Sequence, residues 1–459
     1  MREPAGCLAS LRSLGSLAPP PGVHNLEAVH TVTLFFTTLG MLPATWFAIA
    51  VYSDSNVTYV DGSVLTGERW TAYTPVTHLA NHYGILEPFA AVSNTATFCG
   101  GLGLFLMPFL SGDFMPAPTF AVAAYMALLG ASSWVFHADG SKMDTWQHAA
   151  DRLSMFILFA YMSVACFSGL WHACRGQRAT PRSPIILLTN VGGISFAMYC
   201  VVYQRTIQAF QFLVQTGFVL FTCSYLTMAT LHYHRQSATA PRRRDLHKLL
   251  LASLRAAPST AIKMLALGVA YFIRTAADEE GLDLALAPFG NDTGTFEERV
   301  EWRRLHDVEH GTWHFWTSYA IMAAGLTLVE GLSGELTPPA GYVAAPSFAA
   351  DEQAATRRWL SDWFESEHPA EVVSMLWTCV LLVWTAALEA VEVSSTTWLL
   401  SWALIVALTL PLAASMLAWL VRRHNRRLAK LRAAEPSPSA DAAESESSAG
   451  LSLKADLQA

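Results

Sequence analysis

Long apolar runs recur along the whole chain, and they limit the folds that it can adopt. A transmembrane helix needs about 20 consecutive apolar residues, and ten runs of about that length occur, at 28–52, 88–110, 116–137, 145–170, 184–203, 207–232, 258–274, 307–329, 373–393 and 396–421. Only 14% of the 459 residues are charged, whereas a soluble domain carries about a quarter. We therefore predict an all-α fold, a polytopic transmembrane bundle of about ten spans.

Lys and Arg gather in three places, and this sets the expected orientation of the spans. They cluster at 171–183, at 233–257 and directly after the last apolar run, beginning with Arg422. Short cytosolic loops carry an excess of these residues. Counting the spans from a cytosolic N-terminus puts all three clusters, and both termini, in the cytosol. The same count places the loops 53–87 and 275–306 in the lumen or outside the cell.

This orientation leads to two expectations about individual side chains. Each outer loop contains an acceptor motif for N-linked glycosylation, one beginning at Asn56 and the other at Asn291, so we expect a glycoprotein. Lys263 lies in the seventh apolar run, and we expect its side chain to extend to the cytosolic interface.

Histidines with helical spacing lie at the ends of two apolar runs. His137 follows Ser133 by four residues at the end of the third run, and His310 and His314 are four residues apart near the start of the eighth. Residues four apart share one helical face. Ionisable side chains within membrane spans are costly, and by default they mark a functional site.

The predicted order of spans puts His137, His310, His314 and Asp151 at the same outer end of the bundle, in addition to the helical spacing of the histidines. Three imidazole nitrogens with an open fourth position suit a catalytic zinc ion, which lowers the pKa of a bound water towards neutrality. Asp151 would then accept the proton of this water, and Ser133 would hydrogen-bond the water or the developing oxyanion. We predict the three histidines as metal ligands and Asp151 and Ser133 as catalytic groups.

Purely structural explanations exist for the same residues. A histidine at the end of a span can lie at the interface, and Asp151 can be a carboxylate favoured by the dipole at a helix N-terminus. A serine such as Ser133 can bond back to its own helix. The seven cysteines include no CxxC pair, so they indicate neither a thiolate zinc site nor a disulfide framework.

The motifs SWVFH at 133–137, Asp151, and HGTWH at 310–314 together resemble the signature of the CREST superfamily of membrane hydrolases. This superfamily includes alkaline ceramidases, progestin/adiponectin receptors, and the post-GPI-attachment phospholipase with its myomaker relatives. The resemblance implies a seven-helix core, here 88–329, with Ser and His on its second helix, Asp on its third and HxxxH on its seventh. It also implies that the three histidines of these motifs bind zinc.

The resemblance leaves several residue assignments open. The interval before Asp151 is longer than expected from the ceramidases, so Asp139 and Asp144 are alternatives for the acidic residue. His148 and His306 are further imidazoles that could be ligands or hydrogen-bond partners of ligands. An outward-facing site is more similar to the phospholipase and myomaker branch than to the ceramidases and receptors, whose zinc sites face the cytosol.

Segments outside the core complete the predicted organisation. We predict a cytosolic leader at 1–27, an extra span with its outer loop at 28–87, the hydrolase-like core at 88–329, a cytosolic loop with an interfacial amphipathic helix at 330–372, two C-terminal spans at 373–421 and a disordered cytosolic tail at 422–459. The interfacial helix is expected because aromatic and apolar residues share one face of it. The tail is rich in Ser, Ala and Glu, a composition typical of disorder.

These features predict a zinc-dependent hydrolase that is integral to the plasma membrane or to an endomembrane. Its substrate would be a membrane lipid with an amide or ester bond, such as a ceramide or an acylated phospholipid or GPI, and no nucleic acid is expected as a partner. One alternative is a receptor or membrane-remodelling protein that uses zinc structurally. The other is a transporter, which should carry ionisable residues at mid-membrane on several helices and an internal repeat.

Overall fold

The structure, a computed structural model, describes part of the chain. The described residues are 29–52, 87–111, 117–139, 146–175, 217, 220–230, 246–286, 296–333, 369–391 and 393–434. Within these ranges all regular structure is α-helical and no strand occurs, so the all-α prediction is confirmed there. Residues Met1–Leu417 belong to one compact unit and Ala418–Ala459 to a second.

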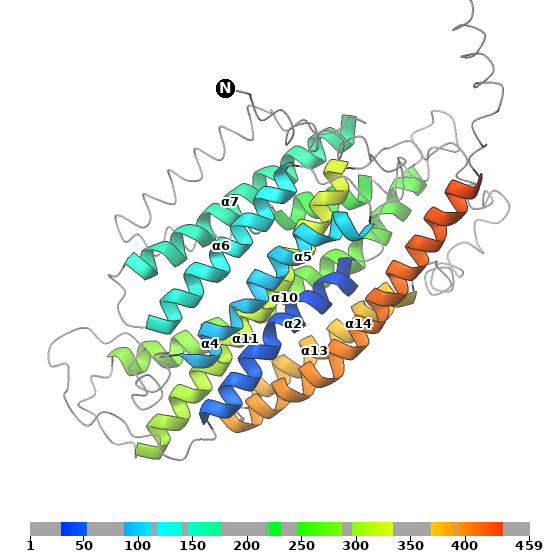
Figure 1. The fold of residues 1–459 in the computed structure, drawn as a ribbon. Helices are drawn as coiled ribbons and strands as arrows, with labels where there is room; N and C mark the ends of the chain where they lie inside the picture. The colour runs from blue at the N-terminus through cyan, green and yellow to red at the C-terminus, as the bar shows by residue number, and fades with distance from the viewer. Residues whose placement is uncertain are drawn as a thin grey trace, which may run out of the picture. The chain divides into compact units, whose positions relative to one another are not determined.

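The described helices cover eight of the ten apolar runs. They are α2 (Val29–Tyr52), α4 (Pro88–Ser93), α5 (Thr95–Ser111), α6 (Ala117–Asp139), α7 (Trp146–Arg175), α10 (Leu246–Leu286), α11 (Phe296–Ser333), α13 (Pro369–Ala390) and α14 (Ser395–Ala434). Of these, α10, α11 and α14 extend well beyond their apolar runs. In the first unit the long helices lie lengthwise beside one another (Figure 1). Among the described residues, seven helical stretches are long and apolar enough to cross a membrane, in α2, α4 with α5, α6, α7, α10, α13 and α14.

These seven stretches agree with a multi-pass membrane protein, but they do not confirm a count of about ten spans. The predicted spans 184–203 and 207–232 lie largely outside the described residues. The seven also differ from the predicted seven-helix core, because they include α2, α13 and α14. The leader, the interfacial helix and both glycosylation acceptors lie outside the described residues. The prediction of a disordered tail is wrong for 422–434, where α14 continues as a helix to Ala434, and 435–459 lies outside the described residues.

Helix α11 contains the predicted eighth span, 307–329, but it is too polar to count among the seven. Its neighbours explain how it tolerates polar residues. It packs against α2, α4, α5, α6, α7 and α10, and most of its side chains between Val308 and Thr327 are buried. A helix that contacts protein on several sides can carry polar groups because neighbouring helices, rather than lipid, surround them.

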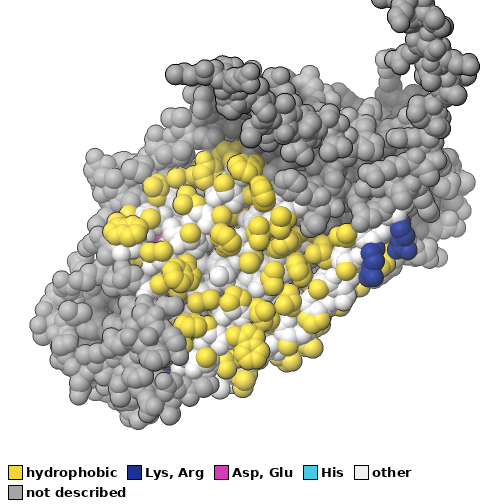
Figure 2. All heavy atoms as spheres, viewed as in Figure 1, with side chains coloured by type: hydrophobic (Ala, Val, Ile, Leu, Met, Phe, Trp, Pro, Cys, Tyr) yellow, Lys and Arg dark blue, Asp and Glu magenta, His cyan; other side chains and the backbone are white. Residues whose placement is uncertain are grey.

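The outward-facing surfaces of the described helices are largely apolar. Many large hydrophobic side chains are exposed, among them Leu128, Leu265, Phe272, Leu376, Val383 and Leu404. Figure 2 shows one face on which apolar side chains are spread across the described surface, with charged side chains only near its edges. Such extensive apolar exposure is typical of a surface that contacts a membrane.

Small residues allow the helices to approach closely. A Cβ atom on Gly40 of α2 would lie 2.4 Å from the Cα atom of Ala96 in α5, and one on Gly101 of α5 would lie 2.7 Å from the carbonyl oxygen of Ala123 in α6. The Thr95 hydroxyl donates a hydrogen bond to the Gly40 carbonyl at the first of these crossings. Glycine at helix crossings is a common basis of packing in membrane bundles.

Two helices begin against a carboxylate from another helix. Glu371 of α13 accepts hydrogen bonds from the backbone N–H groups of His30 (2.7 Å) and Thr31 (3.0 Å) at the start of α2. Glu301 of α11 accepts bonds from the N–H (2.6 Å) and hydroxyl (2.7 Å) of Ser395 at the start of α14. The first N–H groups of a helix lack intrahelical partners, so these carboxylates satisfy donors that would otherwise be costly to bury.

The expectation that Lys263 extends to the cytosolic interface is wrong. Its side chain is 0% exposed, and its Nζ donates a hydrogen bond to the Thr327 hydroxyl at 2.6 Å. Other polar groups are buried in the same part of the bundle, where the His30 ring nitrogens bond to the hydroxyls of Tyr319 (2.7 Å) and Ser259 (2.9 Å). Lysine extends to an interface only along an open path, and here the neighbouring helices enclose it.

The relative direction of two helices agrees with the predicted order of spans. The Ser93 hydroxyl contacts the His314 ring at 2.9 Å, and the Thr97 hydroxyl contacts the Ser318 hydroxyl at 2.5 Å. From the first contact to the second, the residue number rises by four on both helices. The α4–α5 segment therefore runs parallel to α11. The second and eighth spans are expected to cross the bilayer in this same direction.

Candidate metal centre

The structure brings together the three histidines predicted as ligands. His137 lies near the end of α6, and His310 and His314 lie one turn apart on α11. One ring nitrogen from each lies within 4.8 Å of those from the other two, so the group could hold a metal ion. The three side chains are 2%, 5% and 5% exposed, respectively. The group thus combines clustered nitrogen donors with near-complete burial.

A glycine between the two α11 histidines brings α4 close to them. A Cβ atom on Gly311 would lie 2.3 Å from Cδ1 of Phe89 and 3.1 Å from the hydroxyl oxygen of Ser93. Any larger residue at this position would therefore force the Phe89 ring, or α4 with it, to shift. This close approach allows backbone and side-chain groups of α4 to reach the histidine rings.

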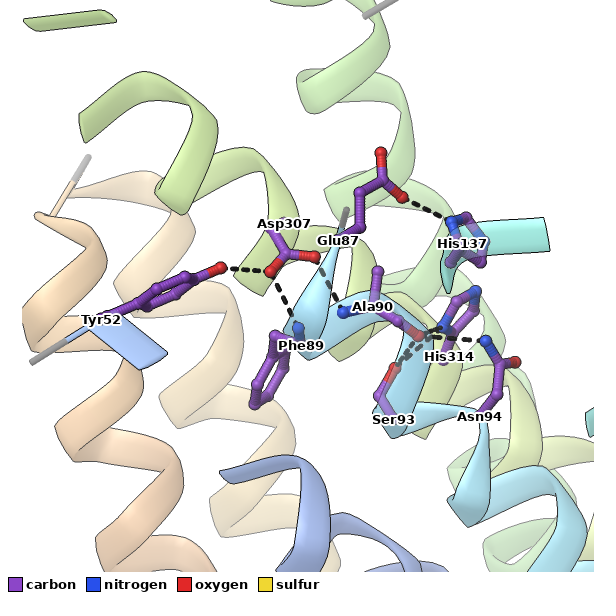
Figure 3. Close-up of polar contacts among 9 residues, drawn as sticks. All are labelled: Tyr52, Glu87, Phe89, Ala90, Ser93, Asn94, His137, Asp307 and His314. Atoms are coloured by element: carbon purple, nitrogen blue, oxygen red, sulfur yellow. Dashed lines mark hydrogen bonds and ion pairs between the residues drawn. The ribbon is translucent and has the colours of Figure 1, made fainter. Parts of the chain in front are cut away.

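Glu87, the residue before α4, holds His137. Its carboxylate oxygen Oε2 lies 2.5 Å from Nδ1 of His137 (Figure 3), and its backbone N–H donates to the His137 carbonyl at 3.3 Å. Because a carboxylate accepts hydrogen bonds, the contact places the imidazole proton on Nδ1. The lone pair is then on Nε2, the nitrogen available to a metal. A carboxylate behind a ligand histidine is a common feature of zinc sites.

His314 is oriented in the same manner by α4. Its Nδ1 lies 2.9 Å from the Ser93 hydroxyl and 3.1 Å from the Ala90 carbonyl oxygen (Figure 3). A carbonyl oxygen can only accept a hydrogen bond, so the bond to Ala90 requires the proton on Nδ1. The lone pair of Nε2 is then available to a metal. The amide of Asn94 donates to the same carbonyl at 3.0 Å. Two of the three rings therefore have the tautomer that metal binding through Nε2 requires.

The start of α4 is itself held by Asp307. The backbone N–H groups of Phe89 and Ala90 donate to the two oxygens of this carboxylate, each at 2.9 Å. The Tyr52 hydroxyl, at the end of α2, donates to it as well (Figure 3). Asp307 lies three residues before His310, so it shares a face of α11 with that ligand.

The two predicted catalytic groups lie on α6 and α7, two helices that pack against each other. Ser133 is buried on α6, one turn before His137. Asp151 is partly buried on α7, and its backbone carbonyl accepts a bond from the Ser154 hydroxyl at 2.7 Å. The Ser154 hydroxyl also contacts that of Ser132 on α6 at 2.7 Å. Among the described residues, the group of mutually close ligand atoms contains histidines alone, and the catalytic roles stay predictions.

The alternative residues are only partly described. His148 is buried, and its ring stacks on Phe136 with a centroid separation of 4.9 Å. His306 is also buried, with its ring centroid 6.1 Å from that of His310. Asp144 and the side chain of Asp139 lie outside the described part of the structure. Neither of the two extra histidines belongs to the group of mutually close nitrogens.

The chain matches no protein-family model, and searches of the curated proteins and of the solved structures find no significant match. The similarity to the CREST superfamily therefore stays an expectation based on five residues. What the centre binds has to be inferred from the chemistry of its own side chains.

Proposed function

We propose that the protein is an integral membrane hydrolase that uses zinc to cleave an amide or ester bond of a membrane lipid. The supporting observation is the buried group of His137, His310 and His314, in which two of the rings donate from Nδ1 to protein acceptors. Three histidine ligands with a fourth position left for water or substrate are typical of catalytic zinc sites. A closed structural site would need a fourth protein ligand.

The donor set favours zinc over the common hard cations. Magnesium and calcium select carboxylate, carbonyl and water oxygens, whereas the group contains imidazole nitrogens. Imidazole also binds copper, nickel and iron, and metal analysis of the purified protein distinguishes these ions from zinc. Bound zinc would supply a Lewis acid that activates water for attack on a carbonyl.

The remaining chemistry is assigned to residues of the chain. We propose that the Asp151 carboxylate accepts the proton of the attacking water and passes it to the leaving group. Ser133 donates a hydrogen bond to the oxyanion that develops on the substrate carbonyl. Glu87 and the α4 groups hold the ligand rings in orientation, so that little rearrangement is needed when substrate binds.

A transporter is the second candidate, because ionisable side chains are buried together on several helices. His30 of α2, Lys263 of α10 and Glu371 of α13 are all buried. However, the His30 ring nitrogens bond to hydroxyls, and the Glu371 carboxylate bonds to the start of α2. Groups satisfied in this manner fix helix packing, so the hydrolase is the better supported proposal.

The proposal is tested by measuring metal content and lipid hydrolysis on the same detergent-purified protein. We expect one tightly bound zinc ion per chain, and release of fatty acid from at least one of ceramide, phospholipid or acylated GPI. A chelator should abolish the hydrolysis and added zinc should restore it. Zinc-loaded protein that releases no fatty acid from any of these lipids would instead support a structural zinc in a receptor or membrane-remodelling protein.

The contact between Glu87 and His137 predicts a distinct effect on metal affinity. Glu87→Gln keeps the size of the side chain but replaces the charged acceptor behind Nδ1. We expect zinc affinity to fall about 10–100-fold, as measured by competition with a chelator. The matched control is Glu301→Gln, which removes a carboxylate that bonds to Ser395 and should leave zinc affinity unchanged. Equal affinities in the two variants would mean that Glu87 does not support the ligand.

A further inference from the structure

The end of α2 is attached to α11 immediately before the metal centre. Tyr52, the last residue of α2, donates its hydroxyl to Asp307. The guanidinium carbon of Arg304 lies 5.2 Å from the centroid of the Tyr52 ring. Arg304 and Asp307 lie three residues apart on α11, and Asp307 is followed by His310 after three more. A helix outside the predicted seven-helix core therefore contacts α11 within two turns of a metal ligand.

Asp307 connects the end of α2 to the start of α4. It is 5% exposed, and it accepts hydrogen bonds from the Tyr52 hydroxyl and from the backbone N–H groups of Phe89 and Ala90. Both backbone polar groups of Ala90 make hydrogen bonds, because its N–H donates to Asp307 and its carbonyl oxygen lies 3.1 Å from Nδ1 of His314. A continuous set of hydrogen bonds thus connects Tyr52, through Asp307 and Ala90, to a ligand ring (Figure 3).

The connection also reaches the second oriented ligand. Glu87 directly precedes α4 and contacts Nδ1 of His137. The two N–H groups that Asp307 accepts belong to the first turn of α4, so its carboxylate sets where that turn lies. A short helix of six residues makes few bonds of its own, and its position depends on such external contacts. A shift of α4 would therefore move the acceptors behind both His137 and His314.

We propose that Tyr52 and Asp307 are positioning residues of the metal centre, and that they act through α4 to hold the acceptors behind the two ligand histidines. The C-terminal turn of α2 thereby helps to determine how tightly the metal is bound. This role presupposes the proposed zinc centre, but it does not depend on which lipid is cleaved.

The test compares zinc affinity and metal geometry in two variants, one that removes the Tyr52 hydroxyl and one that replaces the Asp307 carboxylate by an amide. Tyr52→Phe should weaken zinc binding about tenfold, and Asp307→Asn should weaken it by up to about 100-fold, the range for partners behind metal ligands. Both should also alter the visible absorption of the cobalt-substituted protein, which reports ligand geometry. The matched control is Tyr319→Phe, because the Tyr319 hydroxyl is fully buried but bonds to His30 and Thr378. It should leave zinc affinity and the cobalt spectrum unchanged.

The outcomes separate this inference from the proposed metal centre. Wild-type protein that binds neither zinc nor cobalt would overturn the centre, and the positioning role with it. A wild-type protein that binds zinc, with Tyr52→Phe and Asp307→Asn at wild-type affinity and spectrum, would overturn the positioning role alone. If Asp307→Asn fails to fold, Tyr52→Phe still decides, because it removes one hydroxyl and keeps the ring against Arg304.

Discussion

Replacing His310 and His314 together with alanine is expected to reduce zinc from one ion per chain to background. The two residues supply two of the three clustered ring nitrogens, and a single remaining imidazole cannot hold zinc at micromolar chelator concentrations. Metal content would be measured by mass spectrometry after purification in the presence of zinc. Folding of the variant would be checked by its helical circular dichroism and its elution volume in detergent.

His148→Ala provides the matched control for this double variant. His148 is also a buried histidine near the same end of the bundle, but its ring stacks on Phe136 and it lies outside the group of close nitrogens. We expect the control to retain its zinc. If the double variant kept stoichiometric zinc, the metal would have to be held elsewhere. If instead the His148→Ala variant lost its zinc, His148 would be a metal ligand in place of one of the three clustered histidines.

The meeting of the three histidines could be predicted from the sequence because two simple rules apply. Spacing by four residues puts His310 and His314 on one helical face. Counting alternate crossings then puts the end of the span that carries His137 at the same side as the start of α11. Both rules need only local periodicity and the order of spans, which apolar runs reveal well.

The groups that orient the ligands could not be found by the same rules. Glu87 lies 50 residues before its partner His137, at the end of the predicted outer loop 53–87, and no sequence period relates the two. One available signal was its place directly before Pro88, since an acidic residue followed by proline is typical of a helix start. For Asp307 the signal was spacing, because it falls three residues before His310 and seven before His314 on the same face.

Lys263 and α11 show why hydropathy alone misjudges a bundle interior. The expectation for Lys263 assumed a path to the interface, yet α10 packs beside α11 and the lysine bonds to Thr327. Conversely, the run 307–329 predicted a span, yet α11 is less apolar than the seven helical stretches that could cross a membrane, and the helices around it bury most of its central side chains. Both cases depend on which helices become neighbours, and the apolar pattern of one segment does not contain that information.

Asp151→Asn is expected to lower lipid hydrolysis by about 10²–10⁴-fold, the usual contribution of a general acid–base group. Asparagine keeps the size of the side chain and most of its hydrogen-bonding capacity, but it cannot accept the proton of the attacking water. Zinc content and melting temperature should change little, because the three clustered nitrogens come from other residues. Turnover, bound zinc and melting temperature would be measured on one preparation and compared with Asp139→Asn and Asp144→Asn as matched controls.

The ratio of turnover to bound zinc decides between catalysis and support of the metal. If Asp151 is the base, turnover per bound zinc falls while zinc affinity stays at the wild-type value. If Asp151 instead supports a ligand, zinc affinity falls about 10–100-fold, and each protein molecule that still holds zinc turns over at the normal rate. Full turnover with full zinc would mean that Asp151 has neither role. A loss confined to Asp144→Asn would then assign the base to Asp144, on the segment between α6 and α7.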